Sequence, residues 1–188
     1  MRTAEALQVL AEHRGEAIVV SAMSAAYEWA RISDHPLDFV YLPSAMAHGP
    51  GIALGLALAQ PERRVVALNG DGCMLMSLGS LVTIVEADAT NLVLIVLDNG
   101  IYGITGGQSV PGRGRTDFPT MAHAAGFAHV AAFDDRTSFD SALPDLFSAP
   151  GPAFVNLTVE PEAAGPPPSL PPMPERIARL RGELAGGS

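Results

Sequence analysis

Lysine is absent from this sequence of 188 residues, and all 11 of its basic residues are arginines. Aspartate and glutamate together number 20, which gives a formal net charge of -9. An acidic chain whose arginines form no basic cluster lacks the positive surface that holds a phosphate backbone. The composition therefore argues against a protein that binds nucleic acid.

Cysteine and long apolar runs are equally scarce. Cys73 is the single cysteine, which excludes an internal disulfide and a cysteine-based zinc cluster. The most apolar stretch, residues 51–60, is too short and too rich in glycine to cross a bilayer. Residues 1–5 lack the apolar core of a signal peptide, so we expect a cytoplasmic protein without a membrane segment.

What the chain does contain is enough apolar material for a folded core. Apolar residues make up 48% of the sequence, and the mean hydropathy is +0.24. A disordered chain would be more polar and more highly charged. The length suits one domain, which we expect to span residues 1–160. Residues 161–188 are predicted to be a proline-rich arm followed by a short helix at 175–184.

Helical and strand patterns alternate along the first 160 residues. The stretch 92–98 is apolar at nearly every position, which indicates a strand buried on both faces of a parallel sheet. Strand–helix alternation predicts an α/β fold with about six strands in a mostly parallel sheet and helices on both faces. We expect helices at 3–13, 22–32, 48–59, 74–87, 119–126 and 137–148, and strands at 16–20, 38–42, 65–69, 92–98, 128–133 and 153–159.

Polar residues gather where two consecutive strands end. One strand ends in Asn69-Gly70-Asp71-Gly72 and the next in Asp98-Asn99-Gly100. Ligands bind at the carboxyl ends of strands in open parallel sheets, and these two ends are expected to lie side by side. Carboxylate and amide oxygens suit Mg²⁺, while the glycines let the backbone approach a bulky anion. A helix that starts near Cys73 points its positive end toward the same place.

This pattern resembles the cofactor motif of thiamine diphosphate-dependent enzymes. There, GDG is followed by a spacer in the mid-twenties and then by NN; here, 26 residues after GDG end at Asp98, and Asn99 follows. The departure is Asp98, which stands where the family has its first asparagine. The resemblance implies that Mg²⁺ is bound by Asp71, the Asn99 side chain and the backbone carbonyl of Ile101. It places the following residues near the diphosphate: Gly70, Gly72, Cys73, Gly103 and Ile104.

A second segment, Ser44-Ala45-Met46-Ala47-His48, resembles the GSMG(H) segment of the same family, with alanines in place of both glycines. By resemblance, Met46 wedges under the cofactor and bends it, and backbone groups of Ser44 and Met46 contact the aminopyrimidine. His48 is a candidate catalytic residue that faces the substrate. The alternatives are that Met46 is a core residue and that His48 only caps or lines a helix start.

Residues 70–84 and 92–108 resemble sulfopyruvate decarboxylase β subunits and phosphonopyruvate decarboxylases, and the similarity extends over about residues 1–160. This resemblance implies a carboxy-lyase. It would convert a 3-substituted pyruvate, either sulfopyruvate or phosphonopyruvate, into CO₂ and an aldehyde. Arg113 and Arg115 either meet the substrate's sulfonate or phosphonate or are solvated loop charges.

The family also uses a glutamate from a pyrimidine-binding domain, which this chain is too short to contain. Its own glutamates at 16, 28, 62 and 86 precede strands or lie on helices, away from strand carboxyl ends. A pyrimidine-binding partner subunit is therefore expected to supply the catalytic glutamate.

Two other functions remain open. One is carboligation of the acetolactate-synthase type, because the metal motif identifies the cofactor and not the substrate. The other is a non-catalytic subunit that holds the cofactor or regulates a partner. A nicotinamide-binding protein is disfavoured, because no G-x-G-x-x-G follows the first strand.

Overall fold

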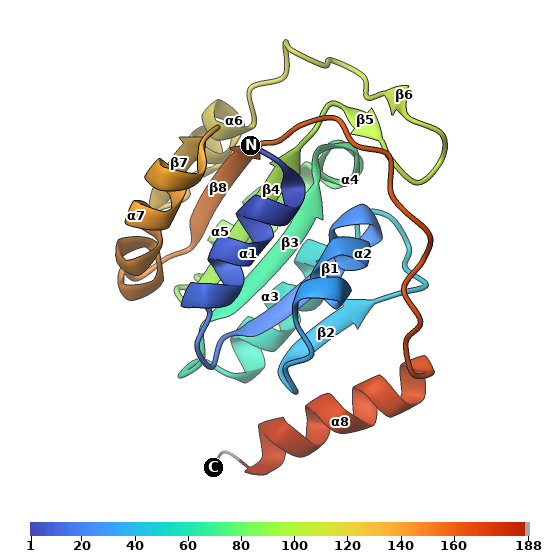
Figure 1. The fold of residues 1–188 in the computed structure, drawn as a ribbon. Coiled ribbons are helices and arrows are strands. Elements are labelled where there is room, and N and C mark those ends of the chain that lie inside the picture. Colours follow the sequence, from blue (N-terminus) through green and yellow to red (C-terminus); the bar gives the residue numbers. More distant parts are fainter. Residues whose placement is uncertain (187–188) are drawn as a thin grey trace.

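The computed structural model describes residues 1–186 and contains a six-stranded sheet in which every pair of neighbouring strands is parallel (Figure 1). The strand order is β2-β1-β3-β4-β8-β7. This confirms the predicted α/β fold. The strands are β1 (Ile18–Ala22), β2 (Asp38–Tyr41), β3 (Val65–Gly70), β4 (Leu92–Asp98), β7 (His129–Phe133) and β8 (Ala153–Thr158).

Helices cover both faces of the sheet (Figure 1). One buried apolar cluster joins the sheet to α1 (Thr3–His13), α2 (Met23–Ile32) and α7 (Arg136–Ser148). A second cluster, on the opposite face, includes α3 (Gly49–Ala59), α4 (Asp71–Met76), α5 (Gly79–Glu86) and α6 (Phe118–Ala125). The central strand β4 has apolar side chains in both clusters, which explains why its sequence shows no alternation.

Two expected elements differ from the structure. The helix predicted over 74–87 is two helices, α4 and α5. The chain leaves helical geometry at Ser77, whose hydroxyl bonds to the Cys73 carbonyl, and Gly79 follows soon after. The strand predicted at 16–20 begins two residues later, because a turn at Gly15 (φ +50) brings the Ala17 amide to the Arg14 carbonyl.

A short hairpin, β5 (Ile101–Tyr102) and β6 (Gln108–Ser109), stands beyond the carboxyl end of β4. The strands expected from the sequence do not include this hairpin.

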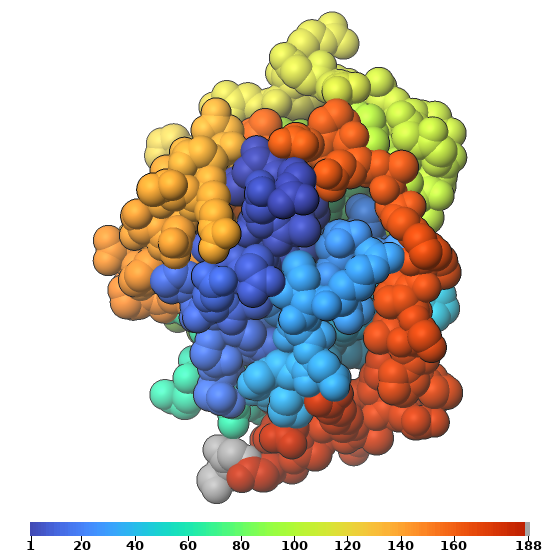
Figure 2. Space-filling view, viewed as in Figure 1, coloured from blue at the N-terminus to red at the C-terminus, as the bar shows by residue number. Residues whose placement is uncertain are grey.

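The end of the chain wraps across the molecule. We call residues 160–172, which contain neither helix nor strand, the C-terminal arm. In Figure 2 the arm runs over the surface beside α2 to reach α8 (Met173–Gly186). The Arg176 guanidinium on α8 donates to the carbonyls of Val40 and Leu42, so α8 is fastened beside the edge strand β2. Within the described part of the chain, no helix has the length and apolarity needed to cross a membrane.

Candidate functional site

The carboxyl ends of β3 and β4 lie side by side, as the sequence predicted. Gly70 pairs with Leu97 across the two strands, so the next residues, Asp71 and Asp98, also come together. Asp71 is 1% exposed. Its two carboxylate oxygens accept hydrogen bonds of 2.8 Å from the Gly72 and Gly100 amides. These bonds fix the carboxylate at the junction of β3, α4 and the β4 loop.

The environment of Asp71 makes it hard to ionise. Burial first, and then the nearby charge and hydrogen bond of Asp98, raise the pKa of its carboxyl to about 6, against the two backbone donors, which lower it. A carboxylate in this setting gains from a bound cation, which would offset both burial and repulsion.

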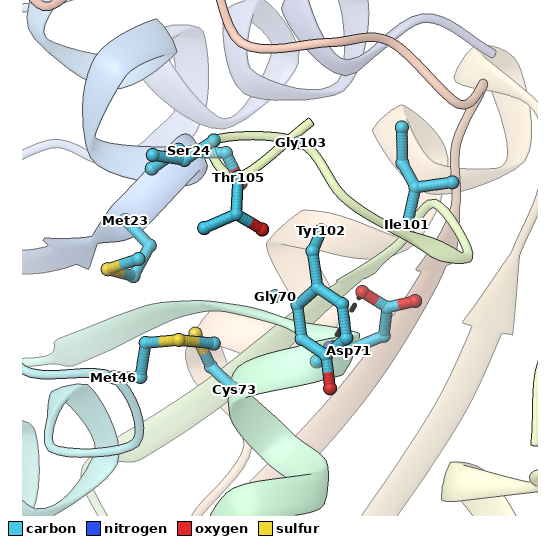
Figure 3. A pocket seen from close by; sticks show the side chains of 12 residues that line it. Met23, Ser24, Met46, Gly70, Asp71, Cys73, Ile101, Tyr102, Gly103 and Thr105 are labelled. Carbon is cyan, nitrogen blue, oxygen red and sulfur yellow. Dashed lines mark hydrogen bonds between the residues drawn. The ribbon is translucent and has the colours of Figure 1, made fainter. Parts of the chain in front are cut away.

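A pocket opens on one side of Asp71 (Figure 3). Met46 and Cys73 lie beside each other in this view, and the Cys73 thiol is in hydrogen-bonding contact with the Ala47 backbone. The ring of Tyr102 lies directly on Gly72, where an added Cβ would be 2.4 Å from the ring's Cε1 atom. The lining residues are Met23, Ser24, Met46, Gly70, Asp71, Gly72, Cys73, Ile101, Tyr102, Gly103, Ile104 and Thr105.

A second pocket also includes Asp71 in its lining. Asn99, Glu28 and Glu162 line it together with Asp71. The Asn99 side-chain oxygen accepts a 2.9 Å bond from the Ile101 amide, which turns this side chain back toward its own loop. Glu162 belongs to the C-terminal arm, which the Ala164 amide ties to the Gly103 carbonyl at 3.1 Å. Of the predicted metal ligands, Asp71 lines both pockets, Asn99 lines only this second one, and Ile101 lines only the first.

Met23 and Ser24, which follow β1, also line the first pocket, although the sequence does not predict them as site residues. Met23 has a positive φ of 55, which is uncommon for a residue other than glycine and costs backbone energy. Its amide donates to the Ser44 hydroxyl at 3.3 Å, and that hydroxyl lies 3.1 Å from the Met23 sulfur. These contacts join the segment that carries Ser44 and Met46 to the start of α2.

Three residues singled out from the sequence do not line the first pocket. His48 is exposed and precedes the first turn of α3. Arg113 packs against Gly100, where its Nε would be 2.6 Å from an added Cβ. Arg115 is exposed on the same loop. The structure also shows Glu28 beside Asp71, closer to the site than its position on a helix suggested.

Cys73 is 4% exposed at the start of α4. Burial raises the pKa of its thiol, against hydrogen bonds from the backbone at Ala47 and Gly70. A helix N-terminus lowers a thiol pKa, but α4 has only six residues and here burial dominates. The thiol is therefore protonated, and Cys73 is poorly suited to act as a nucleophile.

The donor set fits a hard cation next to an anion. The available ligands are a carboxylate, an amide and a backbone carbonyl, all oxygens of the kind that Mg²⁺ prefers. Residues 1–186 hold no group of three His, Cys, Asp or Glu side chains suited to a metal, so a softer ion has no site of its usual kind there. Gly72 lines the pocket with its backbone and, having no side chain, leaves room for the Tyr102 ring.

Comparison with known proteins identifies the family. The model described as "Thiamine pyrophosphate enzyme, C-terminal TPP binding domain" matches residues 20–157. The chain belongs to this family. The matched range includes the sheet from β1 to β8 and both sides of the pocket, so the pocket lies in a thiamine pyrophosphate-binding domain.

Curated relatives narrow the comparison. Phosphonopyruvate decarboxylase of Streptomyces viridochromogenes is 37% identical over 161 residues, which cover 85% of this chain but 40% of that protein. Sulfopyruvate decarboxylase subunit beta of Methanothermobacter thermautotrophicus is 38% identical over 152 residues, covering 81% of this chain and 78% of the subunit. The chain thus spans less than half of the first relative and most of the second.

A solved structure shows the same fold in this family. It is assigned to a thiamin diphosphate-dependent enzyme from Mycobacterium smegmatis and aligns with a TM-score of 0.72 at 22% identity. The alignment covers 86% of this chain and 32% of the other.

Proposed function

We propose that this chain is the diphosphate- and Mg²⁺-binding subunit of a thiamine diphosphate-dependent 2-oxoacid decarboxylase that acts on sulfopyruvate or phosphonopyruvate. The observation that supports this most directly is the buried Asp71 carboxylate at the β3 end, flanked by the pocket in a thiamine pyrophosphate-binding domain. The names of the relatives supply the reaction type and the two substrates. In this proposal residues 1–160 are the binding domain and residues 161–188 an appended arm and helix.

Mg²⁺ would be held by the Asp71 carboxylate, the Asn99 amide oxygen and the Ile101 carbonyl. Gly70, Gly72, Cys73, Gly103 and Ile104 line the same pocket and would surround the diphosphate. The missing side chain at Gly72 makes room for the Tyr102 ring, and both residues line the pocket that would hold the diphosphate. Asp71 would thus hold the cation, and the cation would fix the diphosphate.

The remaining residues would orient the reactive part of the cofactor. Met46 would support the thiazolium ring from below, and the backbone at Ser44 and Met46 would contact the aminopyrimidine. When bound, thiamine diphosphate supplies the electron sink that allows a 2-oxoacid to lose CO₂. The apolar side chains of Met23, Met46 and Ile104 would keep water away from that reaction.

A partner subunit completes the proposed enzyme. Among the described side chains that line the first pocket, Asp71 is the single acidic one. In this proposal its carboxylate binds Mg²⁺, and the glutamate at the Met46 end comes from a partner subunit. The partner would be a pyrimidine-binding subunit, as the beta-subunit naming of the relative suggests.

An uncharged surface beside the pocket suits such a partner. Residues 49–60 and 72–85 contain no charged side chain. Leu58, Met76 and Val82 are 55–61% exposed on α3, α4 and α5. Because α4 starts at Asp71, this surface continues to the pocket, and a subunit bound there would reach the cofactor.

The test is decarboxylation of sulfopyruvate and of phosphonopyruvate with thiamine diphosphate and Mg²⁺. The chain would be assayed alone and together with a candidate pyrimidine-binding subunit. We expect aldehyde and CO₂ only from the mixture, and loss of activity in Asp71→Asn. A Val82→Arg variant should bind the cofactor normally but lose assembly and activity. Cofactor binding without decarboxylation of either substrate would overturn the assigned reaction, and no cofactor binding in the mixture would overturn the whole proposal.

A further inference from the structure

Asp98 places a second carboxylate against the proposed metal ligand. Gly70 and Leu97 are paired across β3 and β4, so Asp71 and Asp98 follow them at the same edge of the sheet. Asp98 is close enough to Asp71 for its charge and a hydrogen bond to raise the pKa of the Asp71 carboxyl. Two carboxyl groups at this separation repel each other when both are ionised.

Within the described part of the chain, the salt bridges include neither Asp71 nor Asp98. Arg113, on the neighbouring loop, packs on Gly100 and forms none of these bridges. Two carboxylates without a cationic partner are stabilised by a divalent ion, and they bind it more tightly than one carboxylate does.

Asp98 itself does not reach either pocket beside Asp71. The first pocket is lined by Asp71 and Ile101, among others, and the second by Asp71 and Asn99. Asp98 accepts a hydrogen bond at its backbone carbonyl from the Val159 amide, at 3.0 Å. Its negative charge therefore acts on the cation through Asp71 and not as a direct ligand.

We propose that Asp98 is a positioning residue that gives the metal site a second negative charge, so that the chain binds a divalent cation without the diphosphate. This inference rests on the proposed function, because it assumes that Asp71 holds the cation. It has a consequence for the order of binding: the cation is held first, and it then attracts the diphosphate.

Asp98→Asn tests the inference, because asparagine keeps the size of the side chain and can donate a hydrogen bond to Asp71. Titrations of the full chain with Mg²⁺ alone would be run at pH 8. We expect the wild type to bind Mg²⁺ and Asp98→Asn to bind it at least about tenfold more weakly. Thiamine diphosphate brings its own negative charge, so the difference should shrink when it is present.

Asp88→Asn is the matched control. It removes the same charge from an exposed residue just before β4, at the opposite end of that strand from Asp98. Asp88 has a positive φ of 49, which asparagine tolerates. Its Mg²⁺ affinity should equal that of the wild type.

Thermal unfolding gives a second measurement. In chelator, Asp98→Asn should melt at a higher temperature than the wild type, because the repulsion with Asp71 is gone. Mg²⁺ should raise its melting temperature less than it raises that of the wild type.

Equal Mg²⁺ affinity in the wild type and Asp98→Asn would overturn the inference, as would a wild type that binds Mg²⁺ only with thiamine diphosphate. Both results leave the proposed function standing if the wild type binds thiamine diphosphate with Mg²⁺. Failure of that binding would overturn the proposed function itself.

Discussion

Tyr102 explains why residue 72 is glycine. α4 is a helix at this position, and alanine is a better helix former than glycine, so local helix propensity does not require the glycine. The requirement comes from the ring that lies on it, since an added Cβ would be 2.4 Å from the ring. The pocket wall and the turn after β3 are thus fitted to each other.

Gly72→Ala should weaken binding of thiamine diphosphate with Mg²⁺ by at least about tenfold, because either the ring or the α4 backbone must move. Isothermal titration would measure it. Gly79→Ala is the control, since a Cβ there meets nothing within 4 Å. Equal losses in both variants would show that the effect is on helix structure and not on the pocket.

Cys73 should be unreactive in the folded chain. Its burial raises the thiol pKa, so little thiolate exists near pH 8 and access is limited. Labelling with a thiol-specific disulfide reagent should be slow in the folded protein and fast in denaturant, and the folded rate should rise with pH only above the ordinary thiol range. Rapid labelling of the folded chain at pH 8 would contradict this assignment.

The residues that sequence could predict are those within one local pattern. Asp71 and Asn99 follow two consecutive strands, so their proximity can be predicted without knowing the whole fold. Met23 and Ser24 line the same pocket because β1 lies beside β3. The order of strands in a sheet depends on the whole fold, so the local sequence does not predict this contact. Tyr102 lies in the segment 92–108, whose sequence resembles the decarboxylases, but only the structure shows that its ring packs on Gly72.

Among the elements, α6 shows how a chain terminates a helix. The Asp117 side chain accepts the Thr120 amide at its start. Gly126 ends it at φ +102, and its amide bonds to the Ala122 and His123 carbonyls. Asp117 and Gly126 are recognisable in the sequence as capping residues, and the predicted boundaries of this helix lie within about one residue of the observed ones. Ser77 is not a typical capping residue at the end of a helix, so the sequence does not predict the break between α4 and α5.

Gly126→Ala should lower the free energy of unfolding by about 1–2 kcal/mol, because alanine is strained at this positive φ. Its Cβ would also be 3.2 Å from a Val85 methyl group. Gly182→Ala, in the middle of α8 with nothing within 4 Å, should instead raise stability by about 0.5–1 kcal/mol. Denaturant unfolding of both variants checks the opposite signs.

For the molecule as a whole, the C-terminal arm connects distant parts. The Glu160 amide bonds to the Met1 carbonyl at 3.0 Å, and the Arg31 guanidinium bonds to the Pro166 carbonyl at 2.6 Å. Arg176 then fastens α8 beside β2. The proline content of residues 161–174 predicted an extended arm, but nothing in those residues indicated the surface it would cross.

Arg176→Ala should release α8, since hydrogen bonds from a charged group contribute about 1.5–3 kcal/mol each. We expect the arm to be cut by a protease at least about tenfold faster, with the sheet still intact by circular dichroism. Arg181→Ala removes the same charge from an exposed position on α8 and should leave the cleavage rate unchanged. Equal rates in the wild type and Arg176→Ala would mean that α8 is held by its apolar contacts alone.

The docking of α8 also protects the edge strand β2 from pairing with other molecules at high protein concentration. β2 is an outer strand of the sheet, and the carbonyls that Arg176 occupies would otherwise be open to another chain. An uncovered outer strand is a template on which a second sheet can add, molecule after molecule. A chain that loses α8 would therefore be prone to self-association through β2, which would appear as light scattering that grows with protein concentration.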